Sequence, residues 1–373
     1  MVSGLYILRL APFLICSLLL ISAGQAKAAD RFVDYWTVEE YLEQYPRQQT
    51  ISKRFIDRVR QGAITDEAIR KPIRIGIIYP GLQVSDYWRR SVTSLEARLQ
   101  EIAPNYELVS HFTTPDTAIS EQAQNLGQFL RQKVDYVIFT LNAARHTELI
   151  RKVIRQEGVK LILQNITTPL KTFQDQQPFQ YVGFDHVIGT EILAQEYIRR
   201  TGGEGTYAIL YGPRGYVNDM RGGTFLKEMR KHPEMVLKAS YYVGFNQEKS
   251  YIATKDLLQS QPDLDFIFSS STDIALGVIQ ALKEAGKLGE VMTNGWGGGG
   301  SELAAIERRE LNFTVMRMND DNGVAMAEAI YLDQIGKSDE VPVVFSGDIR
   351  LVDQSMDKAQ IGELKNRAFR YSK

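Results

Sequence analysis

Two arginines, Arg221 and Arg317, offer the clearest chemistry in this 373-residue sequence. A guanidinium group stays charged and presents its N–H donors as a fork, which suits a small anion held away from water. Each of the two lies next to a predicted strand end, and Arg317 interrupts a segment that is otherwise rich in apolar residues. An exposed or ion-paired role is the ordinary alternative for any arginine. If both reach one cleft from opposite walls, they predict a site for a buried anion.

Four neutral polar residues at predicted strand ends fit the same site: Gln83, Ser85, Asn165 and Thr272. Their side chains both donate and accept hydrogen bonds, which suits the hydroxyl groups of a small polar ligand. The backbone N–H of Ser85 is a further candidate donor, because helix N-termini attract anions. Taken singly, Ser85 is equally a helix cap and Asn165 equally a turn residue. Their joint occurrence at strand ends favours a binding site.

Trp88 and Trp296 are two of the three tryptophans. An indole ring can cover the apolar face of a sugar-like ring and donate a hydrogen bond through Nε1. A place in the core is the alternative for Trp88. Trp296 lies between glycines in a predicted loop, which makes a packing role less natural. We therefore include both in the predicted site.

Other kinds of chemistry find little support in the sequence. The glycine run 297–300 lacks the lysine and hydroxyl residue of a phosphate-binding loop, and we interpret it as a hinge or crossover loop. No G-x-S-x-G motif is present, and the four histidines have no metal-ligand spacing: His111, His146, His186 and His232. We expect no catalytic residues, no metal and no cofactor.

Strands and helices that alternate along the chain must position these residues. From Lys71 onward, apolar strand-like runs end in polar residues and are separated by amphipathic helical segments. This pattern is typical of parallel sheets covered by helices on both faces, whose ligands bind at the carboxyl ends of the strands. Two such blocks followed by a return segment at 341–354 predict an α/β protein with two lobes, several crossovers and a cleft.

The predicted organisation has four parts. Residues 1–28 form a signal peptide, and residues 29–70 form a helical arm in which Thr37 and Glu40 make a capping box and Pro46 ends the first helix. The first lobe comprises 71–185 plus 297–343, and the second comprises 186–296 plus 344–373. The arm either packs against the body or provides a docking surface for a partner.

Composition and charge limit the possible partners. The net charge of −1 gives no electrostatic case for nucleic acid. The only cysteine, Cys16, lies in the predicted signal peptide, so the mature chain has no disulfide. An exported protein of this kind is expected in a bacterial periplasm, with no membrane insertion after the signal is cleaved.

Several long motifs resemble a known family. YVGFDH, NGWGGG and FSGDIRLVDQ are similar to the type I periplasmic sugar-binding proteins related to ribose-binding protein. GLQVSDYW, LILQNIT, NDMRGG, FSSSTD, VMRMND and the helical arm resemble the branch of this family that serves as receptors for the quorum-sensing signal autoinducer-2. The resemblance extends from Lys71 to the C-terminus and involves both predicted lobes.

The resemblance implies two doubly wound parallel-sheet lobes joined by a three-crossover hinge. It implies a furanosyl borate diester as the ligand, with Arg221 and Arg317 as the arginines that bind it. It also implies no enzymatic activity and a signalling partner, the periplasmic domain of an inner-membrane hybrid sensor kinase. The alternative is the periplasmic sugar-binding component of an ABC transporter, in which an acidic residue usually meets the sugar hydroxyls. Asp86 and Asp273 lie beside the proposed ligands and keep this alternative open.

Overall fold

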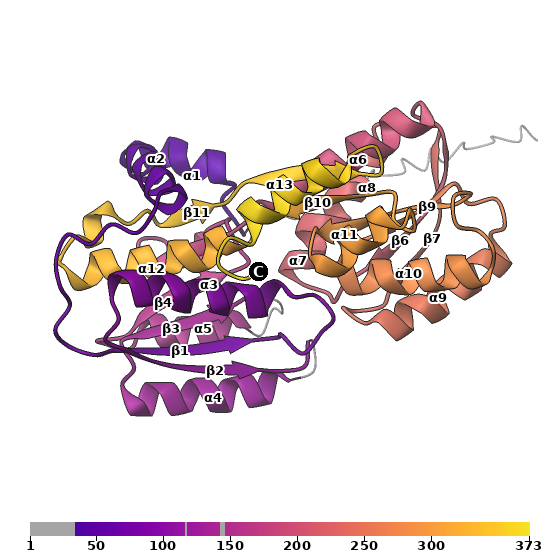
Figure 1. Ribbon diagram of the computed structural model, residues 1–373. Coiled ribbons are helices and arrows are strands. Elements are labelled where there is room, and N and C mark those ends of the chain that lie inside the picture. Colours follow the sequence, from indigo (N-terminus) through magenta and orange to yellow (C-terminus); the bar gives the residue numbers. More distant parts are fainter. Residues whose placement is uncertain (1–33, 116–117, 142–145) are drawn as a thin grey trace, which may run out of the picture. The chain divides into compact units, whose positions relative to one another are not determined.

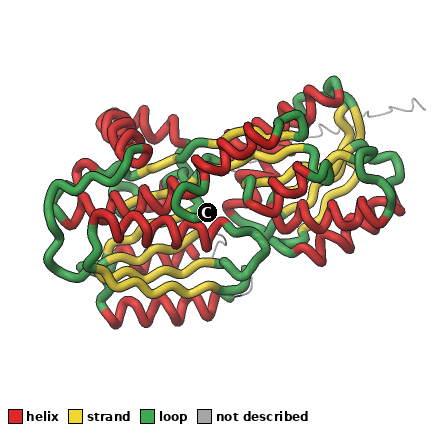
Figure 2. The backbone as a smooth tube through the Cα atoms, viewed as in Figure 1, coloured by secondary structure: helices red, strands yellow, loops and turns green. Residues whose placement is uncertain are grey.

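The computed structural model describes residues 34–115, 118–141 and 146–373 (Figure 1). The predicted signal peptide and the first residues of the predicted arm lie outside the described residues. Within the described ranges, no helix combines the length and the apolar content needed to cross a bilayer. Sheets and helices alternate as the sequence predicts, and Figure 2 shows strands flanked by helices in each half of the body.

The first sheet is entirely parallel, with strand order β11-β5-β4-β3-β1-β2. Its strands are β1 (Ile73–Tyr79), β2 (Tyr106–Phe112), β3 (Tyr136–Thr140), β4 (Lys160–Gln164), β5 (Gln180–Gly183) and β11 (Val344–Ser346). Helices α3 (Tyr87–Ile102) and α12 (Asp320–Gln334) cover one face, and α4 (Ile119–Gln132) and α5 (His146–Ile154) cover the other. Burial on both faces explains why β1 and β3 are almost continuously apolar.

The second sheet has the order β12-β10-β9-β8-β6-β7, with β12 antiparallel to β10. Its strands are β6 (Gly205–Tyr211), β7 (Met235–Tyr242), β8 (Phe266–Ser269), β9 (Met292–Gly297), β10 (Phe313–Arg317) and β12 (Ile349–Asp353). Helices α6 (His186–Thr201) and α8 (Thr224–Met229) pack on one face. The other face carries α9 (Gln247–Ser260), α10 (Thr272–Glu284), α11 (Gly300–Glu307) and α13 (Lys358–Ala368). The predicted two-lobed α/β fold is confirmed.

The chain passes between the two sheets three times: from β5 to α6, from β10 to α12, and from β11 to β12. The predicted lobe boundaries are wrong in two places. Residues 300–317, predicted in the first lobe, form α11 and β10 of the second, because β10 pairs with β9 and β12. β11, predicted in the second lobe, pairs with β5 in the first. The apolar pattern identifies strands but does not identify their neighbours.

The arm consists of α1 (Val38–Gln44) and α2 (Pro46–Arg60). The predicted capping box is present, since Thr37 Oγ1 accepts a hydrogen bond from the Glu40 backbone N–H at 3.1 Å. Pro46, which ends the first helix as predicted, also begins the second, because proline costs no hydrogen bond in a first turn. Phe55 and Val59 of α2 are buried in the core of the first lobe. The arm therefore packs against the body.

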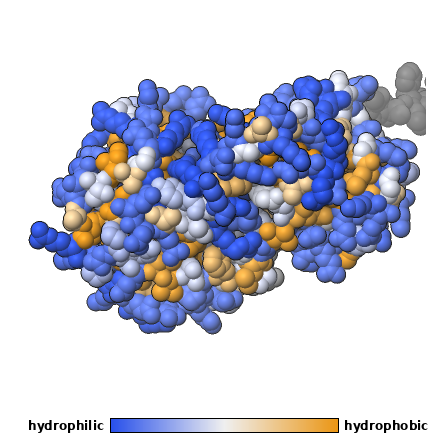
Figure 3. All heavy atoms as spheres, viewed as in Figure 1, coloured by the Kyte–Doolittle hydropathy of each residue, from blue (hydrophilic) through white to orange (hydrophobic). Residues whose placement is uncertain are grey.

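Short helical turns complete the connections: η1 (Lys171–Phe173), η3 (Ser338–Glu340), and α7 (Tyr216–Asn218) followed directly by η2 (Asp219–Gly223) after β6. The last of these matters for the site, because η2 is a π-helical turn that leads directly into α8. The surface in Figure 3 is mostly hydrophilic, with apolar residues scattered over it.

Candidate ligand-binding site

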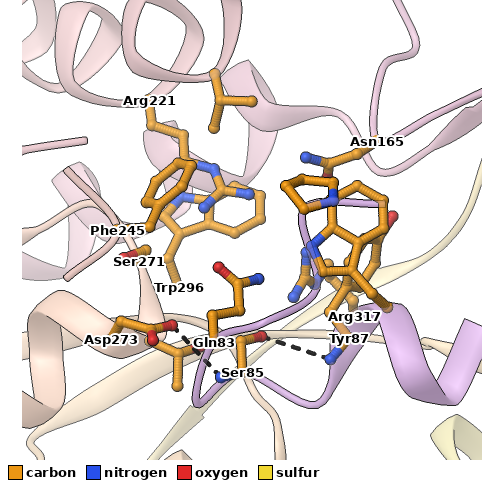
Figure 4. A pocket seen from close by; sticks show the side chains of 14 residues that line it. Gln83, Ser85, Tyr87, Asn165, Arg221, Phe245, Ser271, Asp273, Trp296 and Arg317 are labelled. Atoms are coloured by element: carbon orange, nitrogen blue, oxygen red, sulfur yellow. Dashed lines mark hydrogen bonds between the residues drawn. The ribbon is translucent and has the colours of Figure 1, made fainter. Parts of the chain in front are cut away.

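A cavity lies where the carboxyl ends of strands from both sheets meet, and it leaves only about 30 Å³ for the centre of a water-sized sphere. The first lobe and its loops contribute Pro80, Gln83, Ser85, Tyr87, Trp88 and Asn165. The second contributes Val217, Arg221, Phe245, Ser271, Thr272, Asp273, Trp296 and Arg317. All eight residues predicted from the sequence line this cavity (Figure 4).

Arg317 is the last residue of β10, and only 5% of it is exposed. Its guanidinium group makes no hydrogen bond or ion pair with any residue that the structure describes, and Nε is fully buried. The guanidinium carbon lies 3.9 Å from the ring centroid of Tyr87, a cation–π contact. A side chain on Gly297 would collide with this group, so the glycine makes room for it. Burial lowers the pKa of Arg317, but a guanidinium stays protonated in proteins.

Arg221 lies in the π-helical turn η2 and is 4% exposed. Its Nη1 donates to the backbone oxygen of Ser270 at 2.9 Å, and its Nε donates to His186 Nδ1 at 3.3 Å. The structure gives Nη2 no hydrogen bond to another described residue. Burial lowers the pKa of Arg221, and the positive charge of Arg317 lowers it further. Two cations thus share one cavity wall.

The expectation that the two arginines face each other from opposite walls is wrong. β10 belongs to the second sheet, so Arg317 and Arg221 approach from the same lobe. The ring of Trp296 lies beneath both, 3.7 Å from the guanidinium carbon of Arg221 and 5.7 Å from that of Arg317. The first lobe faces them with neutral and aromatic groups.

The sequence analysis placed Trp296 in a loop, and this prediction is wrong. Trp296 lies in strand β9, where only 1% of it is exposed. Its Nε1 donates to Thr190 Oγ1 at 3.1 Å and is not available to a ligand. Trp296 is therefore a packed platform under the arginines. Trp88, on α3, packs against Tyr79 in a tilted arrangement with ring centroids 4.6 Å apart, and it lines the cavity.

The neutral polar residues differ in whether their hydrogen-bonding groups already have partners. Asn165 follows β4 with a positive φ of 69°, and its buried Oδ1 has no hydrogen-bond partner among the described residues. Gln83 extends toward the centre of the cavity (Figure 4). The Ser85 backbone N–H, predicted as a ligand donor, instead donates to Asp273 at 3.4 Å. Thr272 is the first residue of α10 and lines the cavity.

Asp273 is the most important residue that our site prediction omitted. Its carboxylate accepts hydrogen bonds from the backbone N–H groups of Val84, at 2.8 Å, and Ser85, so it links the second lobe to the first. Burial raises its pKa, although these two donors act in the opposite direction. Asp86 makes a similar link, accepting from the Gly300 backbone N–H at 3.1 Å, but it does not line the cavity. The two lobes are in direct contact across the site.

Tyr87 and Phe245 are further lining residues that the sequence analysis missed. Tyr87 lies between Ser85 and Trp88 in the sequence, and this position is the only indication in the sequence that it lines the cavity.

The loop 297–300 is also different from the prediction. It connects β9 to α11 within the second lobe and is not a crossover, and its Gly298 N–H donates to Glu302 at 2.8 Å.

Comparison with known proteins agrees with this architecture. The model of a family described as periplasmic binding protein domain matches residues 75–338. The chain belongs to the periplasmic binding protein family. Family membership fits a protein with two lobes and a polar cavity between them.

Three similar proteins illustrate the family. The ribose import binding protein RbsB of Salmonella typhimurium is 30% identical over 174 residues, which cover 46% of this chain and 57% of RbsB. The match thus spans little more than half of that relative. A periplasmic solute binding protein of an ABC transporter from Actinobacillus succinogenes, with bound D-allose, has a TM-score of 0.69 at 20% identity, covering 78% of this chain and 99% of the neighbour. The fructose-binding periplasmic domain of a hybrid two-component system has a TM-score of 0.68 at 21% identity, covering 79% and 94%.

Proposed function

We propose that this periplasmic binding protein takes a small sugar-like ligand that carries a negative charge. The observation that carries the proposal is the Arg317 guanidinium, which is buried against the cavity without a hydrogen-bond acceptor among the described residues. Leaving a buried charge uncompensated costs several kcal/mol. An anionic ligand would supply the missing acceptor, and each charge-assisted hydrogen bond would contribute about 1.5–3 kcal/mol.

The carboxylates near the arginines do not replace such a ligand. Both oxygens of Asp273 face the backbone donors of Val84 and Ser85. Glu302 attracts both arginines electrostatically, but its carboxylate is bound by Thr314 and by the N–H groups of Trp296 and Gly298. These carboxylates lessen the positive charge around the cavity. They leave the hydrogen-bond donors of Arg317 unused.

The specific ligand we propose is the furanosyl borate diester form of autoinducer-2, which the sequence resemblance implies. Its tetrahedral borate carries one negative charge suited to Arg221 and Arg317. Its ring hydroxyls would meet Gln83, Asn165 and Thr272, whose side chains both donate and accept.

Lobe closure would convert binding into a signal read by the periplasmic domain of an inner-membrane hybrid sensor kinase. A ligand shifts a population from 1:99 to 99:1 only if it binds the closed state by about 5.5 kcal/mol better. Since both arginines belong to the second lobe, they would hold the anion in the open state as well. The difference must come from the first lobe, where Gln83, Trp88 and Asn165 would contact the ligand only on closure. The hybrid two-component domain of the same fold supports the plausibility of this coupling.

A calorimetric titration of the ligand-stripped protein tests the proposal. The titrants are the autoinducer-2 precursor with borate, the precursor without borate, and ribose. Tight binding that requires borate is expected. Ribose binding that is unaffected by borate would refute the anion assignment.

A second candidate function is the binding component of a sugar importer. It is supported by the similarity to the ribose import binding protein RbsB and to the allose-bound protein of an ABC transporter. Asp273 favours this candidate, because each oxygen of its carboxylate keeps a second lone pair beside the Val84 or Ser85 N–H and could accept a hydrogen bond from a neutral sugar hydroxyl. The ribose arm of the same titration decides between the two. Addition of D-allose extends it to the ligand of the structural neighbour.

A further inference from the structure

His186 connects the two halves of the site without lining the cavity. It is the first residue of α6, at the first crossover between the lobes, and only 1% of it is exposed. Its Nε2 lies 3.0 Å from the backbone oxygen of Asn165, and its Nδ1 lies 3.3 Å from Nε of Arg221. The ring also contacts Trp296, with centroids 5.1 Å apart. One imidazole therefore touches a cavity residue of each lobe.

The two neighbours require one protonation state of this ring. The Arg221 Nε–H can only donate, so Nδ1 must be an unprotonated acceptor. The Asn165 carbonyl can only accept, so Nε2 must carry the proton. An imidazolium would turn an N–H toward the N–H of Arg221 and would add a third positive charge beside Arg221 and Arg317. The geometry fixes His186 as the neutral ring with its proton on Nε2.

Both bonds restrict groups that line the cavity. Holding Nε and Nη1 of Arg221 leaves the remaining guanidinium N–H groups for the cavity. The bond to Asn165 anchors a residue in the left-handed region, which an L-amino acid adopts at a cost. A loose Arg221 or Asn165 would have to be ordered by the ligand, which weakens binding.

We propose that neutral His186 is a positioning residue that orients Arg221 and Asn165 for the ligand and couples them across the hinge. The orientation of Arg221 and Asn165 is a property of the ligand-free protein. The effect on affinity rests on the proposed function, so the experiment has one readout for each.

The first readout needs no ligand. In the full-length mature protein with ¹⁵N-labelled histidine and arginine, NMR reports which ring nitrogen carries the proton, and the His186 signals are those lost in His186→Gln. We expect protonated Nε2 and unprotonated Nδ1 throughout about pH 5.5–8, a range that spans the ordinary histidine pKa. The Arg221 Nε–H signal should be protected from solvent exchange and should lose this protection in His186→Gln. A protonated Nδ1, or an Arg221 signal unaffected by the substitution, would overturn the proposal.

The second readout is affinity for the autoinducer-2 precursor with borate. His186→Asn places an acceptor near Arg221 but is too short for Asn165, whereas His186→Gln reaches toward Asn165 and gives up the Arg221 bond. We expect His186→Gln to weaken binding about tenfold, as for the loss of one hydrogen bond to a charged group, and His186→Asn to weaken it less. His232→Gln, outside the cavity, is the matched control and should change nothing.

The outcomes separate the two proposals. If the wild-type protein does not bind the borate complex, the proposed function fails, and the NMR result alone decides whether His186 positions Arg221. If the wild-type protein binds and His186→Gln binds equally well with a native melting temperature, the positioning role is refuted while the proposed function stands.

Discussion

Two buried arginines of this protein differ in whether the fold supplies hydrogen-bond acceptors for them. Arg98, on α3 in the core of the first lobe, donates to Glu328 at 2.9 Å and to the backbone oxygen of Gln61 at 2.9 Å. Glu328 in turn binds Arg58 of the arm. Arg317, buried almost as deeply beside the cavity, makes no such contact with a described residue.

The difference indicates that the fold itself provides the acceptors of Arg98 and leaves those of Arg317 to a ligand. In the core, a carboxylate and a carbonyl are built in, so the charge of Arg98 contributes to the native state. At the cavity, aromatic faces and a glycine accommodate Arg317 without pairing it. Burial alone therefore does not reveal the role of an arginine, but burial together with its acceptors does.

Substitution of the core arginine should have the largest effect. Arg98→Met is expected to lower the free energy of unfolding by about 3–5 kcal/mol, because it leaves the fully buried Glu328 with only one of its two arginine partners. Urea titration of the ligand-free protein measures the loss. The ligand affinity of the folded fraction should be unchanged. A stability within error of the wild type would show that Arg98 is as dispensable to the fold as we expect Arg317 to be.

A buried histidine sharpens the comparison, because it can lose its charge and an arginine cannot. Burial lowers the pKa of His146 to about 4 from its ordinary 6.5. Below pH 6.5 the unfolded chain takes up a proton that the folded chain excludes, so the free energy of unfolding falls as pH drops toward 4. The whole fall amounts to about 3 kcal/mol. His186, whose pKa is also lowered by burial, adds to it in the same direction.

Urea titrations at several pH values in this range test the effect, with His146→Gln as the comparison. Glutamine can keep the hydrogen bond to Gln122, which His146 makes at 2.9 Å, and it does not titrate. The variant should therefore show a shallower dependence on pH. Equal slopes for the two proteins would contradict the assignment to His146.

The same replacement at the cavity should act on binding and leave the fold intact. Arg317→Met removes a buried charge that has no acceptor among the described residues, so the melting temperature of the ligand-free protein should stay the same or rise. Affinity for the autoinducer-2 precursor with borate should fall at least tenfold, about 1.5–3 kcal/mol for the lost charge-assisted bond. Calorimetry and thermal unfolding measure the two effects. Unfolding of Arg317→Met without loss of affinity would reverse the roles we assign to the two arginines.

The sequence predicted the fold class and the members of the site better than their arrangement. Strand ends and apolar runs identified Arg317, Gln83 and Asn165, because a local pattern is enough to place a polar residue at the carboxyl end of a buried strand. The pattern could not show that β10 pairs with β9 and β12, and it therefore assigned Arg317 to the wrong lobe. Strand order depends on packing between distant segments and leaves no periodic trace.

The contacts of individual side chains were also beyond the sequence. Nothing in the motif around Trp296 indicates that Thr190 accepts its Nε1–H. The sequence shows Asp273 beside the predicted ligands but not that Val84 and Ser85 occupy its carboxylate. His186 was dismissed with the other histidines because its role depends on two neighbours that are distant in sequence. Such residues are found only once the backbone brings the segments together.

A third, more exposed set of arginines completes the comparison and should give the smallest effect. Asp348, at the crossover between β11 and β12, pairs with Arg60 of the arm and Arg367 of α13. Because both arginines are partly exposed, solvent can replace their pairing, and Asp348→Asn should lower the free energy of unfolding by less than about 1 kcal/mol. The loss should shrink further at high salt, unlike that of Arg98→Met. A large loss of ligand affinity in Asp348→Asn would instead mean that the arm controls the hinge, and that an exposed arginine pair can matter more to binding than its stability contribution suggests.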